Sequence, residues 1–122
     1  MTIPMVSVII NCYNSEQYLS EAIDSVLSQT YQNWELVFWD NQSTDNSAEI
    51  VKSYNDPRIH YYYAPEHSNL GQGRINALEK ASANWISYLD ADDLFLPEKL
   101  ERQVNFIIMN TDKNIGLVYS DN

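Results

Sequence analysis

Glycine is scarce in this sequence, and its few positions exclude the common phosphate-binding loops. The chain of 122 residues contains three glycines, Gly71, Gly73 and Gly116. A dinucleotide-binding turn or a P-loop places several glycines directly after the first strand of an α/β unit, where backbone amides hold the phosphates. None of the three follows the first apolar run, so a phosphate ligand would have to be held in another way.

Basic residues are also few. Seven lysines and arginines stand against 17 aspartates and glutamates, which gives a formal net charge of −10. Binding of nucleic acid needs clustered positive side chains, so no nucleic-acid partner is expected. An acidic protein that handles phosphorylated substrates would need a metal ion to reverse the local sign of the charge.

Cysteine and long apolar runs are nearly absent. Cys12 is the one cysteine, which excludes an internal disulfide and fits a reducing compartment or an inert core position. The first 11 residues lack the basic start and apolar core of a signal peptide, and no apolar run approaches the ~20 residues that span a bilayer. We expect a cytoplasmic protein, peripheral to the inner face of the membrane if an anchor lies beyond residue 122.

Short apolar runs alternate with segments of helical spacing. Composition is ordinary for a globular chain, at 44% hydrophobic and 20% charged residues, and the length fits one domain over residues 1–122. Strands are predicted at 6–10, 34–39, 59–63, 85–89 and 115–119. Helices are predicted at 15–29, 47–54, 71–83 and 98–109, with Asn14 or Ser15 capping the first. The alternation favours an α/β fold: a three-layer α/β/α arrangement around a mostly parallel, Rossmann-like sheet.

The end of the chain is interpreted as a cut. The sequence stops three residues after the fifth predicted strand, so we read it as a fragment of a longer protein. The sheet edge that such a cut would leave exposed is expected to favour self-association.

Polar stretches follow three of the predicted strands, at residues 11–14, 40–45 and 90–93. In doubly wound sheets, ligands bind beyond the carboxyl ends of the strands, where the strand order reverses. With the common order 3-2-1-4, the three stretches would meet at one edge of the sheet. We therefore predict a ligand site there.

The last of these stretches contains three carboxylates in four residues, Asp90, Asp92 and Asp93. Like charges so close repel unless they face water, accept hydrogen bonds or hold a cation. We predict that Asp92, with Asp90 or Asp93, binds Mg²⁺ or Mn²⁺, and that the metal grips a diphosphate. The alternative is a solvated loop.

Three further residues are candidates for the same ligand. Asp40 and Asn41 could read a base or ribose by hydrogen bonds, and Arg74 could add a charge-assisted bond to phosphate. An ordinary surface arginine is the alternative for Arg74. His60 and His67 are interpreted as surface residues.

Four stretches together carry a family resemblance: residues 6–14 (VSVIINCYN), 25–31 (SVLSQTY), 40–45 (DNQSTD) and 89–93 (LDADD). In this order and spacing they resemble the family 2 glycosyltransferases of the GT-A fold. The resemblance implies inverting, metal-dependent transfer of a sugar from a nucleoside diphosphate donor to a saccharide or lipid-linked acceptor, in polysaccharide biosynthesis. UDP or dTDP is the favoured nucleotide, and guanosine stays open because Asn41 replaces a commoner second Asp.

The resemblance also implies roles for individual residues. The nucleotide sugar would contact Asn11, Tyr13, Asp40, Asn41, Arg74, Asp90 and Ala91, and the metal would be held by Asp92 and Asp93. In this family the catalytic base comes from a segment well after the Asp-x-Asp stretch, so we expect it beyond residue 122. Residues 1–122 alone would then bind a donor but transfer its sugar poorly.

Two other interpretations compete with a transferase. A binding-only nucleotide-sugar module would use the same pocket without catalysis. A Mg²⁺-dependent signalling receiver domain has a similar length and an acidic pocket. It would need an aspartate at the end of the third strand and a lysine after the fifth, where this sequence has Tyr63-Ala64 and Ser120.

Overall fold

The computed structural model of the chain describes residues 6–109, so the strand predicted at 115–119 lies outside the described residues. Strands and helices alternate along this part, as predicted. The elements are β1 (Val6–Cys12), α1 (Leu19–Leu27), β2 (Trp34–Asp40), α2 (Ser47–Lys52), β3 (Ile59–Tyr63), α3 (Leu70–Leu78), β4 (Trp85–Tyr88) and α4 (Lys99–Met109).

The described strands form one parallel sheet in the order β3-β2-β1-β4, which confirms the predicted topology. β1 pairs with β2 along its whole length, from Val6 opposite Trp34 to Cys12 opposite Asp40. Its pairing with β4 stops earlier, at Ile9 opposite Tyr88. The chain after β4 therefore leaves the sheet while β1 continues, and this opens the edge where the acidic stretch lies.

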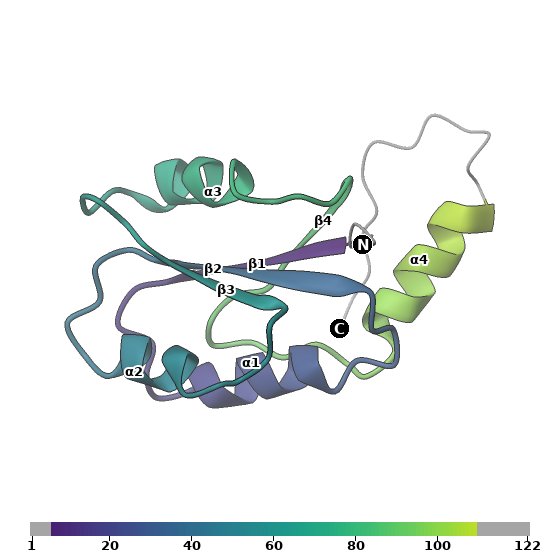
Figure 1. The fold of residues 1–122 in the computed structure, drawn as a ribbon, viewed down its shortest axis with the longest axis horizontal. Coiled ribbons are helices and arrows are strands. Elements are labelled where there is room, and N and C mark those ends of the chain that lie inside the picture. Colours follow the sequence, from purple (N-terminus) through teal and green to yellow (C-terminus); the bar gives the residue numbers. More distant parts are fainter. Residues whose placement is uncertain (1–5, 110–122) are drawn as a thin grey trace.

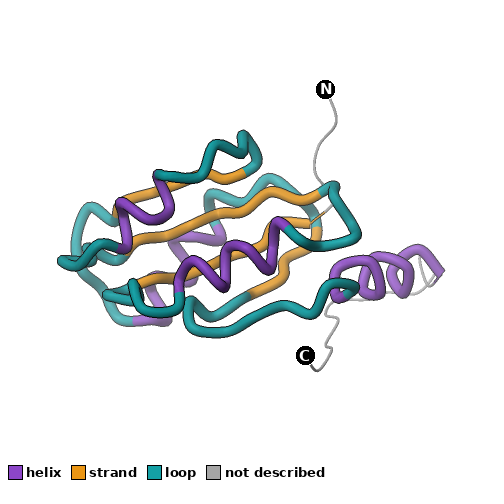
Figure 2. Tube along the Cα trace, turned by 90° about the horizontal axis from the view of Figure 1, so that it is seen from below, coloured by secondary structure: helices purple, strands orange, loops and turns teal. Residues whose placement is uncertain are grey.

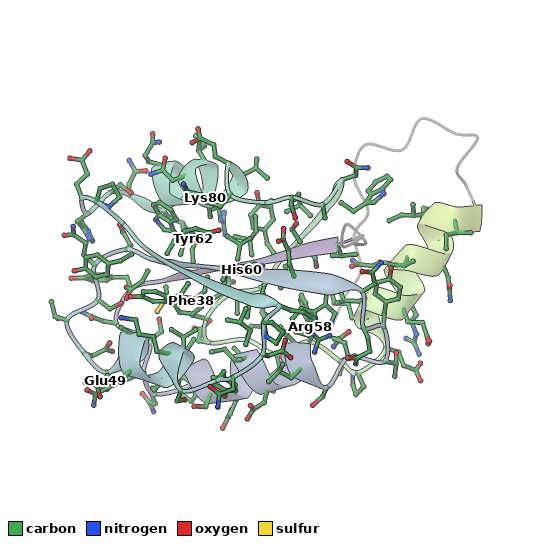
Figure 3. All side chains as sticks on the ribbon, in the orientation of Figure 1. Phe38, Glu49, Arg58, His60, Tyr62 and Lys80 are labelled. Atoms are coloured by element: carbon green, nitrogen blue, oxygen red, sulfur yellow. The ribbon has the colours of Figure 1, made fainter. Side chains whose placement is uncertain are left out.

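Helices cover both faces of the sheet (Figure 1), with α3 on one face and α1 and α2 on the other. Figure 2 shows α1 lying along its face of the sheet. Each face has its own apolar cluster. Phe38 belongs to the cluster under α1 and α2, whereas Trp39 belongs to the cluster under α3, where Tyr62 also packs. In Figure 3, Phe38 points to the side of α1 and α2, and Tyr62 lies with Lys80 on the side of α3.

The two central strands are buried on both faces. Every residue of β2 is buried, and in β1 only Asn11 is partly exposed. Their runs of branched and aromatic residues have no polar alternation, which is typical of strands inside an α/β sheet. The fourth strand differs from this pattern: Trp85 and Ile86 are half-buried and Tyr88 is 45% exposed. In the described part of the chain, β4 lies at an edge of the sheet.

Three helices begin at other residues than predicted; for α4 the difference is one residue, since it begins at Lys99. α1 begins at Leu19 rather than Ser15, and neither Asn14 nor Ser15 caps it. Asn14 has a positive φ of 50°, and its side-chain oxygen instead accepts hydrogen bonds from the amides of Thr44 and Asp45. α3 begins at Leu70, one residue earlier than predicted, and ends at Leu78. No helix in residues 6–109 is long and apolar enough to cross a membrane.

Candidate functional site

Two adjoining pockets lie at the carboxyl edge of the sheet. The first, of about 320 Å³, we call the amide pocket; it is lined by Asn11, Cys12, Tyr13, Asn41, His67, Ser68, Asn69, Leu70 and Gly73. The second, of about 500 Å³, we call the acidic pocket; it is lined by Asn11, Asn14, Ser15, Gln17, Tyr18, Leu70, Asp90, Ala91 and Asp92. Because Asn11 and Leu70 line both, an elongated ligand could occupy the two pockets together.

The end of β1 supplies the boundary between the pockets. Asn11 is partly exposed there, and Tyr13, two residues further along the chain, is 51% exposed. A Cβ atom at Gly73 would lie 3.3 Å from Nδ2 of Asn11, which is closer than an ordinary contact. Glycine at position 73 therefore allows α3 to approach the end of β1. The structure brings Asn11 and Tyr13 together at the site, as the sequence predicted.

Asp40 lies beneath the site rather than in it. Its side chain is buried and lines neither pocket. One carboxylate oxygen accepts a hydrogen bond from the amide of Ser43 at 2.8 Å, and the other accepts one from the hydroxyl of Tyr61 at 2.6 Å. Burial, together with the Asp40 carboxylate, raises the pKa of Tyr61. Asp40 thus stabilises the turn after β2, and its contact with a base or ribose stays a prediction.

Asn41 lines the amide pocket, but its side-chain amide is already paired. Nδ2 donates to the carbonyl oxygen of Ser68 at 2.6 Å, and Oδ1 accepts from the amide of Ser68 at 3.0 Å. The carbonyl oxygen of Asn41 lies 3.1 Å from Nδ1 of His67. Asn41 is therefore the anchor of the loop that follows β3.

That loop was missed as part of the site by the sequence analysis, which treated His67 as a surface residue. His67, Ser68 and Asn69 form one wall of the amide pocket. The ring of His67 lies edge-on to that of Tyr13, with centroids 4.8 Å apart. One signal was available: the carboxyl end of a third parallel strand must reach the same edge of the sheet as the ends of the other strands.

The acidic pocket contains two of the three clustered aspartates. Asp90 and Asp92 line it together with Ala91, whereas Asp93 does not. The amide of Asp93 donates to the carbonyl oxygen of Asp90 at 3.0 Å, which closes a tight turn. The side chain of Asp93 accepts from the amide of Leu94 at 2.8 Å. The exposed carboxylate of Asp92 has no hydrogen bond or ion pair within the part of the chain that the structure describes.

Arg74 brings a positive charge to the mouth of the acidic pocket. One guanidinium nitrogen lies 3.8 Å from a carboxylate oxygen of Asp90, and the guanidinium carbon lies 5.7 Å from the centre of the Tyr88 ring. The Arg74 and Asp90 side chains are 45% and 70% exposed, so their ion pair contributes little to stability. An exposed, weakly paired arginine can leave its carboxylate partner and bind a phosphate with little loss of free energy.

The side chains in the described part of the chain supply too few ligands to complete the predicted metal site. Residues 6–109 contain no group of three or more histidine, cysteine, aspartate or glutamate side chains that could hold a metal ion. Mg²⁺ and Mn²⁺ prefer oxygen ligands, and Mg²⁺ is often held by only one or two carboxylates together with substrate phosphates. The unpaired carboxylate of Asp92, beside Asp90, fits such a cation if a diphosphate supplies the other oxygens.

The chain resembles known proteins over most of its length. Residues 7–122 match the family described as Glycosyl transferase family 2. The Escherichia coli protein named UDP-Glc:alpha-D-GlcNAc-diphosphoundecaprenol beta-1,3-glucosyltransferase WfgD is 38% identical over 117 residues, which make up 96% of this chain and 45% of that protein. The chain spans less than half the length of such curated relatives.

Solved structures resemble the chain over most of its length. S. aureus TarS 1-349 in complex with UDP-GlcNAc is 31% identical, with a TM-score of 0.84 over 88% of this chain and 32% of that one. Mannosyltransferase PcManGT from Pyrobaculum calidifontis, solved with GDP-Man and Mn²⁺, has a TM-score of 0.78 over 88% of this chain and 33% of that one. At 24% identity, this second likeness extends to the fold alone.

Proposed function

Since the chain belongs to glycosyl transferase family 2, we propose that its two adjoining pockets bind a nucleoside diphosphate sugar together with Mg²⁺ or Mn²⁺. One observation carries the proposal: a neutral pocket and an acidic pocket adjoin where the sheet reverses its strand order, between β1 and β4. This is where doubly wound sheets bind nucleotides. Family membership leaves the signalling receiver interpretation without support.

In this proposal, the ligand lies across both pockets. The base and ribose occupy the amide pocket beside Tyr13 and Asn11, and the diphosphate reaches the acidic pocket. We favour a donor whose nucleotide is uridine or thymidine diphosphate, in keeping with the UDP-GlcNAc bound by TarS. The sugar then lies near Asp90 and Ala91, with saccharide or lipid-linked acceptors as the second substrate; WfgD is named for an acceptor of the latter kind.

Each charged residue has a definite task in this arrangement. Asp92 holds the cation, which when bound neutralises the charge that develops on the departing diphosphate. Arg74 leaves Asp90 to donate hydrogen bonds to a phosphate oxygen. Both residues stabilise the diphosphate as a leaving group, which favours cleavage of its bond to the anomeric carbon. In the proposed direct displacement, the acceptor oxygen forms its bond on the opposite face, and this inverts the anomeric centre.

We further propose that residues 1–122 are the donor-binding part of a longer catalytic domain. The chain spans less than half the length of its curated relatives. A carboxylate that deprotonates the acceptor hydroxyl would then come from outside this part. On this proposal, the chain alone binds donor in the presence of Mn²⁺ and transfers its sugar slowly or not at all.

Calorimetry with UDP-glucose, UDP-GlcNAc and a dTDP-sugar, with and without Mn²⁺, tests the donor site. We expect binding that requires the cation and is lost in Asp92→Ala. The family resemblance also assigns Asp93 to the metal, and Asp93→Ala tests that assignment: because this carboxylate lies outside the pocket, we expect its loss to leave binding unchanged. Equal binding by Asp92→Ala and the wild type would remove the assignment of the cation to Asp92. Failure of every nucleotide sugar to bind would refute the proposed function.

A further inference from the structure

We propose that Asn41 is a positioning residue of the amide pocket: it holds the loop of residues 66–69 in place as the pocket wall and does not itself read the nucleotide base. The proposal rests on the proposed function, because it assigns the nucleotide to this pocket. It also departs from our sequence-based expectation that Asn41 contacts the base.

The contacts of Asn41 leave little of its side chain for a ligand. Its amide nitrogen and oxygen both bond to the backbone of Ser68, at 2.6 and 3.0 Å, as two residues do within a β-ladder. Its own backbone amide donates to the carbonyl oxygen of Cys12 at 2.8 Å, which fixes Asn41 to the end of β1. The side chain is thus a rigid bridge from the central strands to the loop after β3.

The loop passes this constraint on to helix α3. Asn69 follows Ser68 directly, and its side chain caps α3 by accepting a hydrogen bond from the amide of Gln72 at 2.8 Å. Leu70 and Gly73, in the first turn of α3, line the amide pocket. The position of one whole wall therefore depends on the bridge between Asn41 and Ser68.

This bridge requires an amide. It uses one donor and one acceptor of position 41, and a carboxylate has no donor for the carbonyl oxygen of Ser68. Aspartate has nearly the same shape as asparagine, so Asn41→Asp removes the donor with little change in volume. It also sets a negative charge against a carbonyl oxygen, which favours displacement of the loop.

Affinities for UDP, CDP and GDP in the presence of Mn²⁺ distinguish a positioning residue from a base-reading one. We expect Asn41→Asp to weaken all three nucleotides by a similar factor, of about tenfold, because the same wall is displaced in each complex. Asn76→Asp is the matched control: its side chain acts only as an acceptor, from Gln72, and an aspartate keeps that bond. A change confined to one nucleotide would overturn the proposal and make position 41 a base contact.

Acidic pH tests whether the bridge depends on the hydrogen-bond donor at position 41. A carboxyl held against a carbonyl oxygen has a raised pKa, and its protonated form donates as the amide did. At pH 5, the affinity of Asn41→Asp relative to the wild type should therefore recover, while that of Asn41→Ala should not. The titratable groups around position 41 are Asp40, Cys12, Tyr13 and His67. They are the same in all three proteins, so the ratio to the wild type removes their effect.

Hydrogen exchange of the Ser68 amide tests the bridge without any nucleotide. We expect protection in the wild type that falls by about tenfold or more in Asn41→Asp and Asn41→Ala at neutral pH. Unchanged protection in both variants would refute the bridge. If no nucleotide binds the wild type, the proposed function fails, but the exchange of Ser68 still decides whether Asn41 holds the loop. If Asn41→Asp does not fold, Asn41→Ala gives the same test at neutral pH.

Discussion

The side-chain oxygen of Gln29 accepts a hydrogen bond from the backbone amide of Leu100 at 3.0 Å, across 71 residues of chain. The nitrogen of the same side chain donates to the carbonyl oxygen of Leu96 at 2.8 Å, and the whole residue is 1% exposed. Ser25 and Thr30 make further bonds to Phe95 and Pro97. The segment that follows the acidic turn is therefore held against the end of α1.

Replacement of Gln29 should destabilise the fold. Gln29→Met keeps the volume but leaves the buried amide of Leu100 without a partner, which costs about 1–3 kcal/mol. It also removes the hydrogen bonds from the Gln29 side chain to the carbonyl oxygens of Ser25 and Leu96. We expect the free energy of unfolding in urea to fall by about 2–4 kcal/mol. Gln17→Met, at an exposed glutamine, is the control and should change it little. Equal free energies of unfolding for the wild type and Gln29→Met would show that the hydrogen bonds of Gln29 contribute nothing to stability.

Glu35 should make stability depend on acidic pH. Burial raises its pKa, but hydrogen bonds from Ser7 and Ser82 and the nearby His60 outweigh burial, so that the pKa lies below its ordinary value of 4.5. Because the pKa is lower in the folded state, this carboxylate stabilises the fold above pH 4.5. That contribution is lost as the pH falls through the folded pKa.

The substitution Glu35→Gln tests this dependence. We expect it to lower the free energy of unfolding at pH 7 by about 1–3 kcal/mol and to flatten its decline below pH 4.5. Glu66→Gln, at an exposed carboxylate, is the matched control and should follow the wild-type curve. Parallel pH profiles for Glu35→Gln and the wild type would contradict the assignment.

Gly73 should matter for binding more than for stability. Gly73→Ala puts a methyl group 3.3 Å from Nδ2 of Asn11, a flexible side-chain end that can move away. Because Asn11 lines both pockets, we expect nucleotide affinity to fall a few-fold, on the order of 1 kcal/mol, with little change in unfolding. In Gly71→Ala, the new methyl group would lie 3.5 Å from Oδ1 of Asn69, which is an ordinary contact. We expect this variant to gain about 0.5–1 kcal/mol of helix stability and to keep its nucleotide affinity. Affinity that falls equally in both variants would argue against a role for Asn11.

Arg74 should contribute to donor binding and hardly at all to folding. Arg74→Ala removes a charge-assisted bond to phosphate, so we expect about a tenfold loss of affinity for UDP measured with Mn²⁺. Its ion pair with Asp90 is exposed, and the unfolding midpoint should stay unchanged. Arg102→Ala removes a comparable exposed pair on α4, with Glu98, and serves as the control. If UDP binds Arg74→Ala and the wild type equally, the guanidinium does not reach the phosphate.

The sequence predicted the sheet and the acidic pocket well because both depend on local patterns. Apolar runs such as 6–10 and 34–39 are long enough to indicate strands, and topology rules then place their polar ends together. The place of Asp92 in this pocket could be predicted because a cluster of carboxylates directly follows an apolar run, whereas its role as a metal ligand stays a prediction. The family resemblance, confirmed over residues 7–122, rests on the same stretches.

The sequence was less informative wherever a residue's role depends on a distant partner. Asp40 is adjacent to Asn41 in the chain, yet one is buried against Tyr61 and the other lines the pocket. The start of α1 is shifted because Asn14 bonds to residues 44 and 45 rather than to its own helix. Such choices depend on contacts between segments some 20 to 31 residues apart, which helix and strand periodicity does not record.

The two pockets have separate supports: Asn41 anchors one wall to β2, and Gln29 holds the segment behind the acidic turn to α1. Substitutions at residues 66–69 lie on the first wall alone, so they can alter the amide pocket without changing the carboxylates that line the acidic pocket. On the proposed function, a site divided in this way can change its donor in small evolutionary steps while the carboxylates of the acidic pocket stay the same.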